Sequence, residues 1–359
     1  EWETKLINDL AVVIGGGTPD TTIKSYWDGE IQWFTPSEIG KNKYVDSSLR
    51  TITEEGLNNS SAKLLPPNTI LLSSRATIGE CSLSLRECAT NQGFQSLVSK
   101  KCYVDFLYYL IQTKKRDLIR KSCGSTFLEI SANEVRKIQV SVPTDVEQQK
   151  IAGLLSLIDE RIATQNKIIE DLKKLKSAIR KKMFSLLKDE YTESFEINQL
   201  LDYEQPTAYI VANDEYSTDT SLTPVLTANK GFILGYTDEK FGIYQKGECI
   251  IFDDFTMDAK YVSFPFKVKS SAIKILTAKP NVNLRFMFEY LSYWELKSEE
   301  HKRHYISEIA SLVIELPSKE RQSIIASLMT SLNSKLDIEA KTKIRYEEQK
   351  RYLLSQMFI

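Results

Sequence analysis

The second half of the chain repeats the first. Shifting the 359-residue sequence by 174 positions places Pro143 on Pro317 and Gln148 on Gln322, and the same shift pairs Met183-Phe184 with Met357-Phe358 without a gap. The match stays in register for about 40 positions, which is too long for a chance similarity. The duplication therefore predicts an architecture built twice, with a pseudo-two-fold relation between its halves.

Each repeated segment predicts one long helix. Thr144 and Glu147 follow Pro143 in the pattern of a capping box, and Ser318 stands in the equivalent N-cap position after Pro317. Apolar residues then recur in alternating steps of four and three, interrupted midway by polar residues, as in a two-helix coil. The apolar positions are Ile158, Ile162, Ile169, Leu172, Ile179 and Met183 in the first copy and Leu332, Leu336, Tyr346, Leu353 and Met357 in the second.

The length of these helices indicates what they pack against. At 1.5 Å per residue each is ~60 Å long, which exceeds the width of a small domain. We therefore expect the two helices to pack on one another as an antiparallel coiled coil. A pair of surface helices, each lying on a globular domain, is the alternative.

A globule precedes each helix, and both globules show the same order of elements. Apolar runs bounded by turn residues predict strands, then one helix, then a short strand and a proline. The fold class is α+β: two α/β globular domains separated by the two long helices, with boundaries at 1–142, 143–187, 188–316 and 317–359. The expected strands are 31–34, 69–73, 81–85, 94–98 and 138–142, then 223–226, 232–236, 249–252, 261–268, 272–276 and 312–316; the expected helices are 104–120 and 284–296.

Composition excludes several classes of protein. The 47 basic and 48 acidic residues nearly cancel, so a nucleic-acid partner has to be argued from local clusters. The five cysteines are scattered and never form C-x-x-C, which argues against a disulfide framework and a zinc ribbon and favours the reducing cytoplasm. No stretch approaches 18 consecutive apolar residues, so we expect no membrane association.

Motifs in both halves resemble one family. The first half carries G-G-T-P at 16–19, S-S-R-A-T-I-G at 73–79 and T-N-Q-G-F at 90–94. The second carries Y-E-Q-P-T-x-Y-I-V at 203–211 and I-I-F-D-D-F-T at 250–256. These stretches are similar to two different recognition-domain types of the specificity (S) subunits of type I restriction–modification systems, and the resemblance covers nearly the whole chain.

The resemblance implies a subunit without catalytic activity of its own. Such a subunit binds double-stranded DNA with a bipartite target, one half per recognition domain. It recruits two methyltransferase (M) subunits through its helical regions, and motor-nuclease (R) subunits join that core. The M subunits use S-adenosylmethionine and the R subunits use ATP and Mg²⁺, so we expect no cofactor on this chain, and a DNA-associated location in the bacterial or archaeal cytoplasm.

The residues themselves offer little chemistry. No phosphate-cradling G-x-x-x-x-G-K-[ST] and no strand-linked G-x-G-x-x-G occurs. Asp253-Asp254 with Asp258-Ala259-Lys260 superficially resembles a metal-dependent nuclease, but all its acids fall within a short stretch; we expect Asp253 and Asp254 to accept from a cytosine amino group or to pair with a lysine. His301 and His304 have metal-like spacing without further ligands nearby, so phosphate contact is favoured and no metal site is expected.

Local clusters supply the candidate DNA contacts. Basic residues gather at 114–121, 267–274 and 301–304, where they could neutralise phosphates, although a charge run is often only a solvated surface. Arg, Asn and Gln are the side chains that read bases in pairs of hydrogen bonds. The candidates in the first domain are Gly16, Thr18, Trp27, Arg75, Asn91, Gln92, Lys121 and Ser125. In the second domain they are Gln205, Thr207, Tyr209, Thr227, Asn229, Lys230, Lys260, Lys269, Ser270, His301, Lys302 and Arg303.

Four alternatives stay open at this point. Gly15-Gly16-Gly17 could let the backbone approach a phosphate or could form a tight turn, and the aromatic candidates could be core residues. The chain could also be an adapter whose globules bind other proteins. Finally, a complex that only methylates DNA would have the same sequence features as one that also cuts it.

Overall fold

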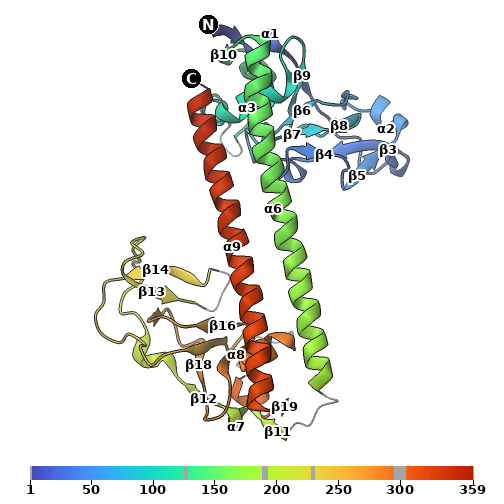
Figure 1. The fold of residues 1–359 in the computed structure, drawn as a ribbon. Helices are drawn as coiled ribbons and strands as arrows, with labels where there is room; N and C mark the ends of the chain where they lie inside the picture. Colours follow the sequence, from blue (N-terminus) through green and yellow to red (C-terminus); the bar gives the residue numbers. More distant parts are fainter. Residues whose placement is uncertain (1, 125–127, 188–192, 228–230, 295–304, 359) are drawn as a thin grey trace. The chain divides into compact units, whose positions relative to one another are not determined.

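The protein is described here by a computed structural model that covers residues 2–124, 128–187, 193–227, 231–294 and 305–358. It consists of two compact units (Figure 1). Unit 1 comprises Glu1–Ile168 and Glu339–Ile359, and unit 2 comprises Ile169–Ile338. Each long helix is thus shared between the units.

Unit 1 is built on three sheets. A five-stranded sheet has the order β2-β9-β6-β7-β4, a three-stranded sheet has the order β5-β3-β8, and β1 pairs with β10. The strands are β1 Glu3–Leu6, β2 Ala11–Gly15, β3 Trp27–Phe34, β4 Tyr44–Val45, β5 Arg50–Ile52, β6 Ile70–Leu72, β7 Cys81–Ser84, β8 Cys88–Thr90, β9 Gln95–Ser99 and β10 Gln139–Val142. The helices are α1 Ile7–Leu10, α2 Glu54–Asn58, α3 Val104–Thr113, α4 Lys115–Arg120 and α5 Ala132–Arg136, with short 3₁₀ turns at Lys24–Tyr26 and Pro36–Glu38.

Unit 2 repeats much of this plan with fewer short helices. A four-stranded sheet has the order β12-β18-β15-β16, a three-stranded sheet has the order β14-β13-β17, and β11 pairs with β19. The strands are β11 Glu193–Glu196, β12 Leu201–Glu204, β13 Thr223–Leu226, β14 Ile233–Thr237, β15 Cys249–Asp253, β16 Ala259–Val262, β17 Lys267–Val268, β18 Ile273–Ala278 and β19 Val313–Leu316. The helices are α7 Ile197–Leu200 and α8 Leu284–Tyr293, with a 3₁₀ turn η4 at Pro206–Tyr209 and a π-helical turn at Tyr305–Ile309.

Two predicted elements are interrupted. The helix expected over 104–120 breaks at Lys114, directly after Thr113, whose hydroxyl donates back to the carbonyl of Leu110 at 2.7 Å. The strand expected over 261–268 is divided into β16 and β17, because Pro265 lies between them and cannot donate to a sheet.

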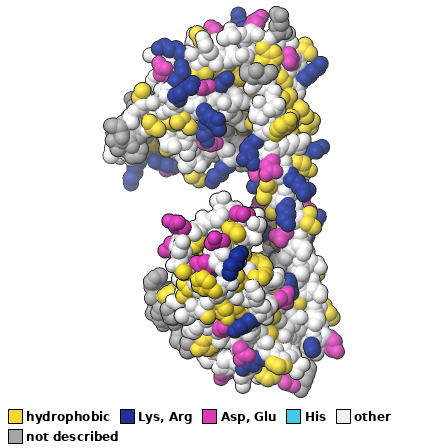
Figure 2. All heavy atoms as spheres, turned by 90° about the vertical axis from the view of Figure 1, so that its left-hand side faces the viewer, with side chains coloured by type: hydrophobic (Ala, Val, Ile, Leu, Met, Phe, Trp, Pro, Cys, Tyr) yellow, Lys and Arg dark blue, Asp and Glu magenta, His cyan; other side chains and the backbone are white. Residues whose placement is uncertain are grey.

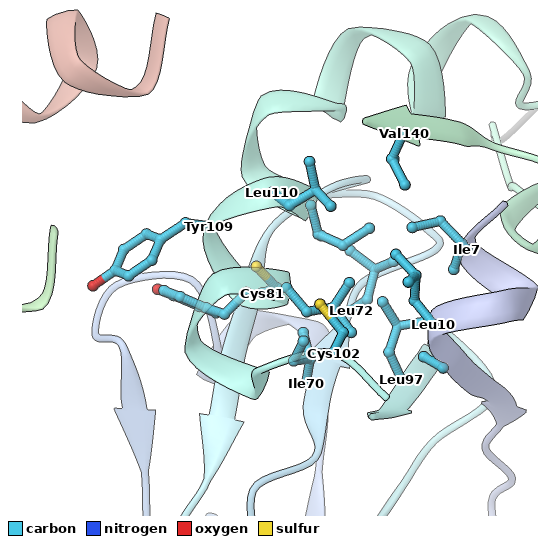
Figure 3. Packing of buried hydrophobic residues seen from close by; sticks show 14 of the residues in the cluster. Ile7, Leu10, Ile70, Leu72, Cys81, Leu97, Cys102, Tyr109, Leu110 and Val140 are labelled. Carbon is cyan, nitrogen blue, oxygen red and sulfur yellow. The ribbon is translucent and has the colours of Figure 1, made fainter. Parts of the chain in front are cut away.

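The core of unit 1 lies between the larger sheet and the helices. Ile70 and Leu72 of β6 and Leu97 of β9 point toward Leu110 of α3, and Ile7 of α1 joins them (Figure 3). Each of these side chains is less than 2% exposed. Phe106 of α3 also packs against Phe358, with ring centroids 5.2 Å apart, so the end of the second long helix is anchored in this core.

The two long helices are α6, Asp145–Leu186, and α9, Lys319–Met357. In unit 1, the first half of α6 and the second half of α9 contribute to one core, through residues such as Leu155 and Leu353. In unit 2, the second half of α6 and the first half of α9 do the same, through Met183 and Leu332. Early residues of one helix therefore accompany late residues of the other, which is the antiparallel pairing expected from the sequence.

The predicted coil positions are buried or half-buried. Ile158 is 5% exposed, and Ile179 packs against the core of unit 2. The polar middle of the pattern is paired inside unit 1: the Gln165 amide, 6% exposed, donates to the carbonyl and carboxylate oxygens of Glu339. The half-buried positions are Ile162, Ile169, Leu172, Ile179, Met183, Leu332, Leu336, Tyr346, Leu353 and Met357.

The starts of the two long helices are fastened in the same way. The Gln148 amide donates to the carbonyl of Pro143 at 3.0 Å and accepts from the backbone N–H of Tyr103, the residue before α3, at 2.9 Å. The Gln322 amide makes the equivalent bonds to Pro317 and to Asn283, the residue before α8, both at 2.9 Å. Each buried glutamine therefore joins its long helix to the helix of the neighbouring domain.

The helix caps agree in part with prediction. Ser318 accepts the backbone N–H of Arg321 at 3.3 Å, as an N-cap does. Glu147, expected to complete a capping box, instead accepts from the indole N–H of Trp2 at 3.3 Å. Helix α6 is thereby tied to the strand that begins the chain.

Candidate nucleic-acid interface

Strand ends gather several predicted DNA-binding residues at one edge of unit 1. Strand β3 is parallel to β8 and antiparallel to β5, so the end of β3, the end of β8 and the start of β5 coincide. The ends of β2 and β6 lead into the same region. We call the loops that meet here the unit 1 rim: residues 16–18, 35–38, 46–49, 73–75 and 91–94.

Backbone contacts connect the loops of the unit 1 rim. The N–H of Gly17 donates to the carbonyl of Thr90 at 2.8 Å, and the N–H of Ser74 donates to the carbonyl of Gly93 at 2.8 Å. The hydroxyl of Thr18 donates to the side-chain oxygen of Gln92. The G-G-T-P, S-S-R-A-T-I-G and T-N-Q-G-F stretches, which are far apart in the sequence, therefore form one surface.

The glycines of this rim serve packing within the protein. A β-carbon on Gly16 would lie 2.1 Å from the carbonyl oxygen of Asn91, and one on Gly17 would lie 2.2 Å from the hydroxyl of Ser61. Neither position tolerates a side chain, because the obstructing atoms include backbone. At these two glycines, the missing side chain lets the chain pack closely against other backbone of the same domain. The sequence did not distinguish this role from phosphate binding.

Arg75 is held at the rim in a half-exposed position. Its guanidinium donates to the Glu129 carboxylate at 2.7 Å, and this hydrogen bond raises the pKa of Arg75. The Arg75 side chain remains 44% exposed, so part of its donor fork faces solvent. Asn91, half-buried, and Gln92, exposed, lie on the adjacent loop. The rim thus presents the three planar side chains that are suited to base edges.

Trp27 is a core residue, which corrects its assignment as a DNA contact. The side chain is 7% exposed, its indole N–H donates to the carbonyl of Asp20 at 3.1 Å, and its ring meets that of Trp33 at 90° with centroids 5.1 Å apart. The guanidinium of Arg50 covers the remaining face at 3.5 Å. These contacts leave little of the ring available to DNA.

The basic cluster at 114–121 is partly neutralised by acids that come from elsewhere in the sequence. Lys115 pairs with Glu80, and Lys121 lies 4.0 Å from Glu134. Arg120 pairs with Asp117 at 2.7 Å. Of these three acids, only Asp117 lies within the basic cluster in the sequence. Figure 2 shows further Lys and Arg side chains spread over the amino-terminal domain, in the upper part of the view. Ser125 lies outside the described residues.

A second group of loops comes together in unit 2. The backbone N–H of Val211 donates to the carbonyl of Val268, and that of Lys269 donates to the carbonyl of Leu226, both at 3.0 Å. These bonds connect the segments that carry Gln205, Thr207, Thr227, Lys269 and Ser270, which are exposed except for the half-buried Thr227. We call these segments, 205–211, 226–227 and 268–270, the unit 2 rim. Asn229, Lys230, His301, Lys302 and Arg303 lie outside the described residues.

Three assignments in unit 2 need correction because the side chains are buried. Tyr209 is 8% exposed and its hydroxyl donates to the Glu204 carboxylate at 2.7 Å. Lys267 and Lys274, expected to contact phosphates, are 0% and 1% exposed. Lys267 pairs with Glu239, and Lys274 lies 3.5 Å from Asp254. Lys260 remains half-exposed, 3.5 Å from Asp258.

The two aspartates that suggested a nuclease are used by the fold. The Asp253 carboxylate accepts the backbone N–H groups of Phe255 and Thr256 at 2.8 and 3.1 Å. The Asp254 carboxylate accepts the N–H of Tyr305 at 2.8 Å and pairs with Lys274. Asp254 therefore pairs with a lysine, which was one of the two expected roles. Among the described residues, no group of three His, Cys, Asp or Glu side chains could hold a metal ion.

A charge cluster in each unit, half-buried in unit 1 and buried at Glu289 in unit 2, joins the long helices to the neighbouring domain. In unit 1, the Asp159 carboxylate of α6 accepts from the hydroxyl of Tyr109 on α3 at 2.6 Å and pairs with Lys350 of α9 at 2.7 Å. In unit 2, the carboxylate belongs instead to Glu289 on α8, which pairs with Arg180 of α6 at 2.6 Å.

The unit 2 cluster extends to both long helices. Lys176 of α6 lies 3.9 Å from the Glu289 carboxylate, and Asn333 of α9 donates to it at 3.3 Å. Lys176 and Lys350 are equivalent positions of the 174-residue repeat, and so are Asp159 and Asn333. Sequence reasoning missed these clusters, although the polar interruptions of both helical patterns were their visible signal.

A family model described as "Type I restriction modification DNA specificity domain" matches residues 1–174 and 190–348. The chain belongs to this family. Among the described residues, no helix is long and apolar enough to cross a membrane.

Family members of known type resemble parts of the chain. The type I restriction enzyme MjaIX specificity subunit of Methanocaldococcus jannaschii is 38% identical over 216 residues, covering 59% of this chain and 50% of that protein. The EcoR124I/EcoR124II specificity subunit of Escherichia coli is 39% identical over 178 residues, covering 44% and 43%. The chain thus spans half or less of the length of these two relatives.

A solved structure supports the fold assignment. The S subunit of the type I restriction–modification system from M. genitalium has a TM-score of 0.67, with 16% identity, over 100% of this chain and 96% of that one. This likeness extends over both units. The fold class predicted from the internal repeat is therefore confirmed.

Proposed function

We propose that the chain is the DNA-reading subunit of a type I restriction–modification complex. The observation that carries the proposal is the duplication: two unlike recognition domains are joined in the same way to the same pair of long helices. A molecule with two different reading surfaces suits a target with two different halves and an unread spacer. The subunit would supply the sequence preference, and other subunits would supply the chemistry.

The two rims are the surfaces proposed to face DNA. The unit 1 rim combines Arg75, Asn91 and Gln92 with the hydroxyl of Thr18, and the unit 2 rim presents amide, hydroxyl and ammonium groups, including those of Gln205 and Lys269. Planar donors and acceptors of this kind discriminate bases in the major groove, while hydroxyls and lysines hold phosphates. Each rim would thus read one half-site.

The outer faces of the long helices suit the binding of the methyltransferase subunits. On both helices, exposed apolar residues stand one position before the buried coil positions, which turns them about 100° away from the partner helix. Leu154 and Leu328, equivalent positions of the repeat, are 43% and 40% exposed. The other members are Leu157, Ile168 and Leu175 on α6 and Ile324 and Tyr352 on α9.

The repeat places Leu154 and Leu328 at equivalent exposed positions, so each long helix offers one matching apolar contact, whereas the other members of the two stripes differ. This arrangement supports recruitment of two copies of one partner, the M subunit. In the proposed complex, S-adenosylmethionine is bound by the M subunits and ATP and Mg²⁺ by the R subunits, and this chain holds none of them. The complex would act on chromosomal and incoming DNA in the cytoplasm.

Salt dependence of DNA binding separates this proposal from an adapter protein. The chain is co-purified with its M subunits, and the affinity for duplex DNA is measured between 50 and 200 mM salt, the range over which a protein that makes 6–10 phosphate contacts weakens by about 10³–10⁵-fold. A double variant, Arg75→Ala with Lys269→Ala, should lower affinity, and Leu85→Ala, an exposed residue outside the unit 1 rim, should not. Binding that hardly changes with salt would contradict the proposal.

A further inference from the structure

Leu49 projects into solvent from the unit 1 rim. It lies in the loop between β4 and β5, and its side chain is 87% exposed. The chain on both sides is polar, from Asp46 to Ser48 and then Arg50. An isolated apolar side chain among polar neighbours does not suit the core of a protein interface, where apolar residues are contiguous.

The backbone that carries Leu49 is fixed. The N–H of Leu49 donates to the Glu38 carboxylate at 2.6 Å, and the other oxygen of that carboxylate accepts the N–H and hydroxyl of Thr35, both at 2.7 Å. The N–H of Ser48 donates to the side-chain oxygen of Gln32 at 2.7 Å.

The following residue is fixed as well. The hydroxyl of Ser48 donates to the carbonyl of Arg50 at 2.6 Å and accepts the N–H of Trp33 at 2.9 Å. The guanidinium of Arg50 is stacked 3.5 Å from Trp27. The loop therefore holds an exposed leucine in a set position, so little conformational entropy is lost when the side chain meets a ligand.

The sheet places Leu49 near the predicted base-reading residues. Arg50 is opposite Trp33, and Phe34 is opposite Thr90, so Leu49 and Asn91 lie on either side of the end of β3. Two strand spacings separate them by about 10 Å. This separation corresponds to about three base-pair steps of 3.4 Å, so both side chains can reach one half-site.

We propose that Leu49 reads the C5-methyl group of a thymine in the half-site bound by unit 1. The methyl group is the apolar feature of a base pair in the major groove, and side chains recognise it by apolar contact. This inference rests on the proposed function and adds a base and a chemical group to it. A contact between Leu49 and an M subunit is the competing explanation.

The test replaces each thymine of the mapped half-site by deoxyuridine, which lacks only the methyl group. With the S subunit in complex with its M subunits, the replacement at one position should weaken binding about fourfold. This factor corresponds to the free energy gained when one methyl group is removed from water. Leu49→Ala should weaken binding to the natural duplex by a similar factor, and deoxyuridine at that position should then have no further effect. Leu85→Ala, with 50% exposure on a loop outside the rim, is the control and should behave like the wild type.

The outcomes separate the two proposals. Equal losses for Leu49→Ala on thymine and deoxyuridine duplexes, or a half-site without thymine, would overturn the role of Leu49 alone. So would a weaker M-subunit interaction with unchanged base preference. A wild-type complex that binds no bipartite duplex would instead contradict the proposed function. Melting temperatures of both variants should match the wild type, because the exposed side chains contribute little to the core.

Discussion

Replacing Glu289 should destabilise unit 2 far more than replacing an exposed glutamate. The Glu289 side chain is 3% exposed and accepts from Arg180 at 2.6 and 3.0 Å. In Glu289→Ala, Arg180 and Lys176, with side chains 18% and 17% exposed, lose this opposite charge. Breaking a buried pair by removing one partner costs about 3–5 kcal/mol. Because both cations keep some exposure, we expect the free energy of unfolding to fall by about 3 kcal/mol.

The assay is urea unfolding, followed by circular dichroism and by the fluorescence of Trp294, whose ring lies 5.1 Å from that of Tyr290 on α8. Glu248→Ala is the matched control, because Glu248 is 54% exposed and its pair with Arg285 spans 3.4 Å. Exposed pairs of this kind contribute about 0–1 kcal/mol.

A double-mutant cycle tests the physical reason. If the Glu289–Arg180 pair carries the effect, Arg180→Ala should lose much of its cost in the Glu289→Ala background, with a coupling energy of about 1–3 kcal/mol. The reasoning would be refuted if Glu289→Ala cost no more than Glu248→Ala, or if the two changes were additive.

Three further predictions concern the buried cysteines, the Glu239 carboxylate and the length of the long helices. Burial raises the pKa of four thiols, those of Cys81, Cys88, Cys102 and Cys249, to about 12. Iodoacetamide at pH 8 should therefore modify only the exposed Cys123 of the native protein. Rapid modification of any other cysteine, detected by mass spectrometry, would contradict this prediction. The hydrogen bond from Lys267 lowers the pKa of Glu239 below its ordinary value of 4.5. The unfolded state therefore binds more protons, and the stabilisation present above pH 4.5 is lost as the pH falls. Between pH 6 and 3, the melting temperature of Glu239→Gln should depend less on pH than that of the wild type, and parallel profiles would refute this prediction. One heptad can be inserted in each long helix, between residues 168 and 169 and between residues 338 and 339, which adds ~10 Å to the helix length. Methylation mapping should then show a tolerated spacer about 3 bp longer. An unchanged spacer would argue against a measuring role for the helices.

The long helices were predictable because a local pattern encodes them. Regular apolar steps through Ile158 and Ile179 and their equivalents predicted two paired helices, and the polar interruption at Gln165 coincides with the paired amide observed there. The repeat itself extends further than the shift of 174 indicates. E-x-x-x-I-N-x-L occurs at 3–10 and again at 193–200, where it forms β1-α1 and β11-α7. This offset of 190 was missed because the intervening loops differ in length.

The rims were predictable only in part. The motifs that carry Thr18, Arg75 and Gln92 do meet in space, but burial depends on contacts that the local sequence does not contain. Lys267 and Lys274 read as phosphate ligands because Glu239 and Asp254, their partners, come from other strands and loops. The exposed position of Leu49 had no sequence signal, because it depends on hydrogen bonds that the backbone of Leu49 and Ser48 donates to the side chains of Glu38 and Gln32.

Genome-wide mapping of methylated adenines tests the central claim most directly. The chain is co-expressed with its M subunit, in wild-type form and with changes confined to one rim: Asn91→Ala with Gln92→Ala in unit 1, or Gln205→Ala with Thr207→Ala in unit 2. The account predicts a bipartite motif, and it predicts that each pair of changes alters the bases of one half only. A continuous motif, or a change in unit 1 that alters both halves alike, would contradict it.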